Sequence, residues 1–160
     1  MREVEYRKAV FPINSIRVCI DQYENMDLSG RIYSKMREGP IHFGSCSELL
    51  LKTDRLFDEE CFPQAFQQKR TFREQEVCRG YRGKPKETIT DDFILEQSGT
   101  YGTMDILVQT RCKTGWQGAI KSRELSEVFH FQSEMELLKK IVDITGNIQR
   151  RPMWDKLPGT

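Results

Sequence analysis

The chain has 160 residues, of which 38% are hydrophobic and 31% charged, and its formal net charge is +1. This length suits one domain or two very small ones, and the composition excludes collagen-like, mucin-like and wholly disordered chains. No stretch reaches the roughly 18 apolar residues that a membrane-spanning helix needs, and residues 1–8 lack the apolar centre of a signal peptide. We therefore expect a cytoplasmic domain with a hydrophobic core.

The first predicted elements are strands joined by turns. Residues 4–10 alternate between apolar and polar side chains, and a turn is predicted at 12–14. Every second residue of 16–20 is a branched aliphatic, a period that indicates a half-buried strand. A turn-forming segment at 24–27 leads to a further strand over 28–34. The sequence therefore predicts a β-hairpin preceded by an extra strand.

A short strand at 41–43 then leads directly into a helix. Ser45 and Glu48 have the Ser-x-x-Glu spacing of a capping box, in which the serine oxygen accepts a hydrogen bond from a free amide of the first turn and the glutamate bonds back to the serine amide. One face of the predicted helix carries Leu49, Leu50, Thr53, Leu56 and Phe57.

The chain also contains an internal repeat. A shift of 88 positions aligns residues 28–52 with 116–140 without a gap, and ten of these 25 positions are identical. Average amino-acid usage would give about one or two identities by chance. The identical positions include Gly30 and Gly118 on the inward strand face, where a glycine indicates close approach by another backbone or a bulky neighbour. We interpret the repeat as the duplication of a hairpin-plus-helix unit.

The second copy predicts the same elements as the first. A strand over 89–97 is expected before it, followed by strands at 104–108, 116–122 and 129–131. A second capping box, Ser133 with Glu136, then begins a helix whose apolar face is formed by Leu137, Leu138, Ile141 and Ile144, and Gly146 is expected to end it.

These elements predict an α+β fold in one domain: an antiparallel sheet of six to eight strands with two helices on one face, built from the duplicated β-hairpin-plus-helix unit. Repeat one spans about 1–62, a basic connecting segment about 63–87, repeat two about 88–148, and a C-terminal tail 149–160. Each unit is too small to bury its own apolar faces, so we expect the two helices to pack on a shared sheet.

The second copy carries a recognisable pattern. The strand that begins Trp116-Gln117-Gly118 and the helix start Phe131-x-Ser133-x-x-Glu136-Leu137-Leu138 resemble small uncharacterised bacterial proteins of no established activity. The likeness covers roughly the last 45 residues, and the first copy departs from it with Leu28-Ser29 in place of Trp116-Gln117. The resemblance implies kinship of fold and a bacterial or mobile-element origin. It transfers no active site.

The segment between the copies is basic. Residues 69–86 hold seven basic and two acidic side chains, a net charge of +5 that leaves −4 for the rest of the chain. Such a segment could contact phosphates and stack on a base, or it could be a solvated loop. A nucleic-acid-binding accessory protein would use Lys69, Arg70, Arg73, Arg79, Tyr81, Arg82 and Lys84.

The sheet face away from the two helices offers a second candidate surface. Its side chains mix charged, polar and apolar types, as surfaces for protein partners or self-association do. The alternative is that a central segment of the chain folds over this face. Trp154 in the tail could anchor to a partner or to its own domain. The predicted partner surface comprises Arg31, Tyr33, Leu107, Ala119 and Trp154.

The two histidines, His42 and His130, occupy equivalent positions and could mark a hydrolase site or a metal site, although strand-end imidazoles more often bond nearby backbone groups. The five scattered cysteines suggest reduced, mostly buried thiols. The sequence contains none of the common catalytic or nucleotide-binding motifs, so we expect no cofactor, no metal and no catalytic residue. The leading hypothesis is a protein-binding or accessory module, with an inhibitory role or a homodimer among its forms.

Overall fold

The computed structural model describes residues 11–60, 86–111, 115–124 and 127–150, which form one six-stranded antiparallel sheet and its helices. The strand order in the sheet is β3-β2-β1-β4-β5-β6. The strands are β1 (Ser15–Glu24), β2 (Asp27–Ser34), β3 (Ile41–Phe43), β4 (Gly102–Thr110), β5 (Gln117–Ser122) and β6 (Val128–Phe131), and the helices are α1 (Cys46–Glu60), α2 (Asp91–Glu96) and α3 (Glu134–Arg150).

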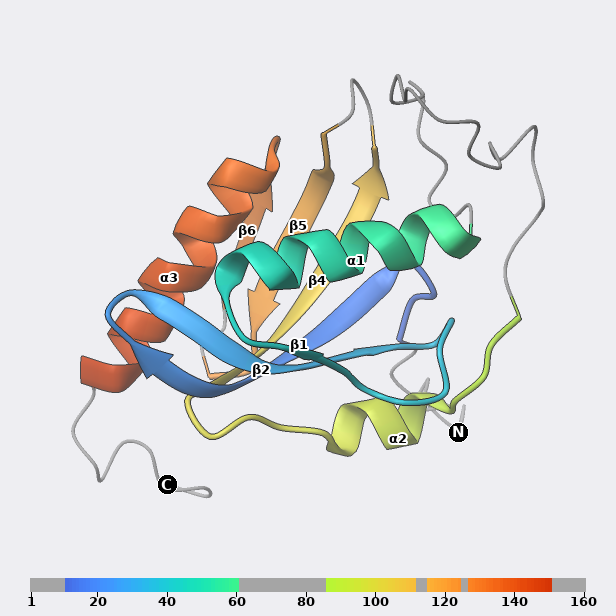
Figure 1. Cartoon of the computed structure of the whole chain (residues 1–160), viewed down its shortest axis with the longest axis horizontal. Coiled ribbons are helices and arrows are strands. Elements are labelled where there is room, and N and C mark those ends of the chain that lie inside the picture. Colours follow the sequence, from blue (N-terminus) through green and yellow to red (C-terminus); the bar gives the residue numbers. More distant parts are fainter. Residues whose placement is uncertain (1–10, 61–85, 112–114, 125–126, 151–160) are drawn as a thin grey trace, which may run out of the picture.

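The helices divide between the two faces of the sheet. Buried residues of α1 and α3 share one core with the inward side chains of β1, β2, β4 and β5, so both helices cover the same face (Figure 1). The short helix α2 belongs to a second, smaller cluster on the opposite face. The predicted α+β class is therefore confirmed, with an antiparallel sheet and helices packed on it.

The first hairpin forms where the alternation of side chains predicts it. β1 and β2 are joined at Asn25 and Met26, whose φ angles of 52° and 62° are both positive. Two consecutive positive φ angles are typical of the tight turns that match the twist of paired strands. This geometry favours asparagine at the first position, since its side chain tolerates the left-handed region.

The two halves of the sheet pair in matching registers. Ile16 lies opposite Ser34, and Met104 lies opposite Ser122. The second pair is therefore the first pair shifted by 88 positions along the chain. The β1–β2 ladder has a bulge between residues 20 and 22, and the β4–β5 ladder has one between 108 and 110, again 88 positions apart. At the centre of the sheet Arg17 lies opposite Asp105. These two residues are also at equivalent positions of the two copies, because 17 plus 88 is 105. The sheet thus has an approximate twofold axis at this pair.

Both predicted capping boxes begin helices. The Ser45 oxygen accepts a hydrogen bond from the Glu48 amide at 3.1 Å, and the Ser133 oxygen accepts one from the Glu136 amide at 3.2 Å. The two glutamate carboxylates accept from the amides of Gly44 and Gln132. These amides lie one residue before the serines, so the glutamates reach one position further back than the motif predicts.

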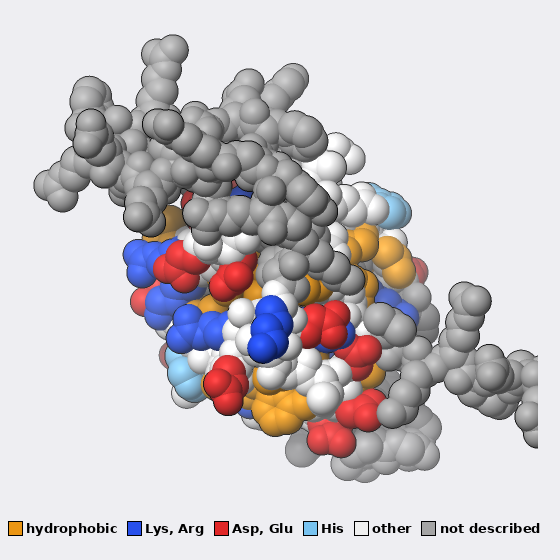
Figure 2. All heavy atoms as spheres, turned by 90° about the vertical axis from the view of Figure 1, so that its right-hand side faces the viewer, with side chains coloured by type: hydrophobic (Ala, Val, Ile, Leu, Met, Phe, Trp, Pro, Cys, Tyr) orange, Lys and Arg blue, Asp and Glu red, His pale blue; other side chains and the backbone are white. Residues whose placement is uncertain are grey.

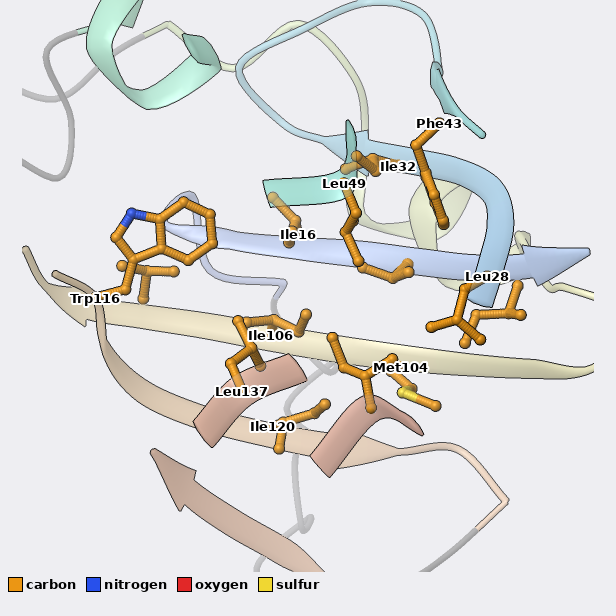
Figure 3. Packing of buried hydrophobic residues seen from close by; sticks show 14 of the residues in the cluster. Ile16, Leu28, Ile32, Phe43, Leu49, Met104, Ile106, Trp116, Ile120 and Leu137 are labelled. Atoms are coloured by element: carbon orange, nitrogen blue, oxygen red, sulfur yellow. The ribbon is translucent and has the colours of Figure 1, made fainter. Parts of the chain in front are cut away.

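The main core lies between the sheet and α1 with α3. Figure 3 shows Leu49 of α1 and Leu137 of α3 among side chains from the four central strands. At one end of this core the Trp116 ring packs edge-on against Phe57 of α1, with 5.7 Å between ring centroids. Most of each helix face predicted from the sequence is confirmed, because Leu49, Thr53, Leu56, Phe57, Leu137, Ile141 and Ile144 are buried. The other two predicted residues, Leu50 and Leu138, are half-buried at the edges of these faces.

Two local predictions were wrong, and the predicted strand over 4–10 lies outside the described residues. Residues 89–97 do not form a strand: Thr90 caps a short helix by accepting a hydrogen bond from the Phe93 amide at 3.2 Å, and two aspartates occupy the first turn, where the helix dipole favours negative charge. Gly146 does not end α3, which continues to residue 150 because Ile148 adds a further turn of buried contact with the core.

Candidate functional site

The sheet face away from α1 and α3 is covered over its β1–β2 half. Cys19 and Tyr33 point from these strands into a small cluster with Ile94 of α2 and Phe11, and all four side chains are buried. The chain around α2 therefore closes this half of the face. The alternative reading of the sequence, in which a central segment folds over the sheet, is what the structure shows here.

Arg17 fixes α2 to the sheet. Its guanidinium, only 6% exposed, forms two 2.8 Å hydrogen bonds with the Asp105 carboxylate. Its Nη1 also donates to the carbonyl oxygens of Ile94, Leu95 and Gln97, at 3.2, 2.9 and 3.3 Å. The hydrogen bond to Asp105 raises the pKa of Arg17, so the buried group stays charged. Arg17 therefore has a structural role: it donates hydrogen bonds to backbone carbonyls at the end of α2.

Lys35 and Arg31 hold the chain on either side of α2. Lys35, 4% exposed, pairs with Glu87 at 3.2 Å and with Asp91. The Nη2 of Arg31 donates to the Ser98 carbonyl at 2.8 Å, and its Nε contacts Asp21 at 2.9 Å. Both cations therefore bind groups of the chain itself.

Two residues of the predicted partner surface fall in this covered half. Tyr33 is 5% exposed, and its hydroxyl accepts a hydrogen bond from Arg31 Nη1 at 2.9 Å. Phe93 of α2 packs edge-on against the Tyr33 ring, with 6.2 Å between centroids. Arg31 and Tyr33 are thus occupied by contacts within the chain. Trp154, also predicted for this surface, lies outside the described residues.

The β4–β6 half of the same face is covered by none of the described helices. Leu107 lies opposite Ala119, Ala119 opposite His130, and Lys121 opposite Val128, so these five side chains share one surface. Leu107 and Ala119 are partly exposed, and Val128 is 53% exposed. We call Leu107, Ala119, Lys121, Val128 and His130 the open half-face.

The two histidines do not form a common site. His42 lies on β3 and His130 on β6, which are opposite edges of the sheet. Both side chains are exposed. Among the residues that the structure describes, no group of three or more His, Cys, Asp or Glu side chains could hold a metal ion. The hydrolase hypothesis therefore stays a prediction for each histidine separately.

Cys19 is the buried thiol of the covered half. Desolvation by burial raises its pKa to about 11, against the smaller opposing influence of Arg31 and Arg17. The half-buried Cys46 is shifted in the same direction, again chiefly by desolvation. Since the thiolate is the nucleophilic form, Cys19 is suited to packing and not to covalent chemistry near neutral pH.

This burial predicts a loss of stability at high pH. Between about pH 9 and pH 11 the folded chain keeps the Cys19 proton that the unfolded chain releases, so the free energy of unfolding falls as pH rises. Urea denaturation from about pH 8 to pH 10.5 should show up to about 2 kcal/mol of this loss in the wild type and less in a Cys19→Ala variant. Identical pH slopes for the two proteins would contradict the assignment.

The predicted nucleic-acid residues lie outside the described part of the chain. This applies to Lys69, Arg70, Arg73, Arg79, Tyr81, Arg82 and Lys84, so nucleic-acid binding stays a prediction.

Sequence reasoning missed the cations that organise the covered half. Neither Arg17 nor Lys35 was among the predicted site residues, although one signal was available: Arg17 and Asp105 are of opposite charge and 88 positions apart. In a duplicated antiparallel sheet, counterpart residues of the innermost strands can meet at the axis. Opposite charges there are what a buried pair requires.

Within the described residues, no helix is long and apolar enough to cross a bilayer. Comparison with protein-family models, curated proteins and solved structures finds no match to this chain.

Proposed function

We propose that the protein is a non-catalytic protein-binding module whose partner contacts the open half-face. The observation that carries the proposal is the unequal covering of one sheet face: α2 and its flanking residues close the β1–β2 half, and no described helix closes the matching β4–β6 half. Apolar side chains on a strand face gain free energy when a partner removes them from water.

The chemistry of the open half-face suits a protein partner. Leu107, Ala119 and Val128 supply apolar contact, and Lys121 and His130 supply hydrogen-bond donors beside it. Protein interfaces likewise combine apolar and polar side chains. This mixture of side chains favours an accessory or inhibitory factor that acts by occupying another protein.

The test compares capture of partners by matched variants. Wild type, Ala119→Glu and Leu51→Glu would be immobilised and exposed to an extract of the native host. Leu51 is 70% exposed on α1, on the other side of the sheet, so its variant controls for an added surface charge. Proteins held by wild type and Leu51→Glu but lost from Ala119→Glu support the proposal.

Two results would count against it. If Ala119→Glu retains every captured protein, the partner does not use this surface. If wild type retains nothing above a blank support and sediments as a monomer, the open half-face has no protein occupant. Sedimentation as a dimer that Ala119→Glu dissociates would support binding and identify the partner as a second copy.

We also propose that the fold arose by duplication of one strand–strand–strand–helix unit. Supporting this are the ten identities at an offset of 88, the equal offset of the paired registers, and the equal offset of the two bulges. Gly30 and Gly118 occupy the same place beside these bulges. Registers and bulges need not coincide in unrelated hairpins, because each is set locally.

A further inference from the structure

A second surface lies at the opposite edge of the sheet, between β3, the loop before it, and α1. This cleft has a volume of about 390 Å³. Pro40, Ile41 and Leu56 supply its apolar wall. At the left of the view in Figure 2, blue Lys and Arg side chains lie close to a pale-blue histidine, with red Asp and Glu side chains among them. The size falls within the range of small-molecule sites.

The charged lining of the cleft is mainly positive. Arg37, Lys52 and Arg55 line it with His42, against the single carboxylate of Glu59. Lys52 is already engaged, since its Nζ donates to the His42 carbonyl at 2.7 Å and lies 3.6 Å from Glu48.

The two arginines differ from the other cations described above. Within the described residues no ion pair or side-chain hydrogen bond engages Arg37 or Arg55, and both side chains are exposed. Arg17, Arg31 and Lys35, in contrast, all bind acidic groups of the chain. The guanidinium groups at the cleft are therefore available for a ligand.

The walls that carry these arginines are anchored. Next to Arg37, Met36 is buried in the main core at 5% exposure and its amide donates to Ser34 Oγ at 3.1 Å. Arg55 precedes Leu56, which is 4% exposed and packs in the same core. Anchored walls lower the entropic cost of binding, because the backbone is already ordered.

The corresponding place in the second half of the chain has a different chemistry. With the offset of 88, Ile41 corresponds to Phe129 and Arg55 to Asp143. There Lys140 lies over the Phe129 ring, 4.5 Å from its centroid. An aromatic ring and a carboxylate thus replace the smaller aliphatic and the cation of the cleft. The positive cleft is a property of the first half and not of the shared fold.

We propose that this cleft binds a phosphate monoester, with the dianionic phosphate between Arg37 and Arg55 and the organic body against Ile41 and Leu56. Guanidinium groups match phosphate oxygens in both charge and hydrogen-bond geometry. The apolar wall favours an ester over inorganic phosphate, since it contacts only a ligand that has an organic part.

The test is a titration followed by backbone amide NMR spectra at constant ionic strength. The ligands are AMP, ribose 5-phosphate, inorganic phosphate and adenosine. We expect saturable shifts of the amides of residues 37–39, 41–42 and 52–59, a lower Kd for at least one ester than for inorganic phosphate, and no shifts there with adenosine.

Matched variants separate a site from general attraction of anions. Arg55→Asp reverses the charge and Ile41→Phe fills the cleft, each with the residue found at the corresponding place of the second half. Each should weaken ester binding at least about tenfold, because Arg55→Asp removes a charge-assisted hydrogen bond and Ile41→Phe removes the space that the ligand occupies. Lys139→Asp, an exposed charge reversal on α3, should leave Kd unchanged. The spectra themselves report whether each variant is folded.

Three results would overturn the proposal. These are the absence of saturable shifts at millimolar ester, equal affinity for every ester and inorganic phosphate, and equal weakening by Lys139→Asp and Arg55→Asp. The last would mean that the net charge of the protein, and not the cleft, attracts the anion.

Discussion

Replacing Gly118 with alanine is expected to remove more than about 3 kcal/mol of stability, a large part of what a small domain has. A Cβ atom at Gly118 would lie 1.8 Å from the carbonyl oxygen of Leu107 on the neighbouring strand. Gly30 has the same relation to the Cys19 carbonyl, at 1.9 Å. Both obstacles are backbone atoms, so relief requires β4 and β5, or β1 and β2, to move apart and lose ladder hydrogen bonds.

Gly39 provides a matched control in the same chain. A Cβ there would meet no atom within 4 Å, so Gly39→Ala should change stability by no more than about 0.5 kcal/mol. Urea denaturation of Gly30→Ala, Gly118→Ala and Gly39→Ala, monitored by circular dichroism, gives the three values under one condition. A Gly118 variant within about 1 kcal/mol of wild type would mean that the strands tolerate separation at this bulge.

The sequence predicted the parts of the fold that depend on neighbouring residues. The alternation in 16–20, the capping box at Ser45 and the one at Ser133 are local signals, and each is confirmed. The inward glycines were also predicted to mark close approach by another backbone or by a bulky neighbour, and the nearest obstacle in the structure is a backbone carbonyl at both positions. The prediction was possible because alignment of the two copies shows a glycine at the same position in each, and a glycine inside a strand indicates a close approach.

The errors came from segments whose structure depends on distant contacts. Over 89–97 the apolar residues Phe93, Ile94 and Leu95 are consecutive, so their spacing favours neither a strand nor a helix. The segment is a helix whose terminal carbonyls are bonded by Arg17, 77 to 80 positions away in the chain. No local pattern carries that information. Gly146 was misjudged for a similar reason, since Ile148 extends the buried face beyond it.

The candidate surfaces were predicted only in part. The sequence placed Leu107 and Ala119 on a strand face away from the two helices, and the structure leaves both partly exposed. It placed Tyr33 there too, although α2 buries that side chain. Alternation assigns residues to a face, but it does not say which half of the face another segment covers. The cleft beside β3 was not predicted, because Arg37 and Arg55 come to line one cleft only through the packing of α1.

Arg17→Met is expected to cost about 3 kcal/mol and to release α2 from the sheet. The substitution keeps a long apolar side chain at this buried position, but it removes the paired hydrogen bonds to Asp105 and the donor shared by three carbonyls at the end of α2. A carboxylate and several carbonyls then lose their partners, which costs more than the pair itself contributes. Urea denaturation gives the cost, and hydrogen exchange at residues 91–97 reports the release of the helix.

Arg31→Met is the comparison for this loss. Arg31 also contacts a carboxylate twice and holds the Ser98 carbonyl beyond α2, but its side chain is 25% exposed. Water can replace part of that interaction, so about 1 kcal/mol is expected. In Arg17→Met/Asp105→Leu the orphaned carboxylate is gone, and part of the lost stability should return. The carbonyls of α2 remain without a donor, so full recovery is not expected. If Arg17→Met and Arg31→Met lower the free energy of unfolding equally, and hydrogen exchange of the α2 amides is unchanged, Arg17 does not anchor the covered half.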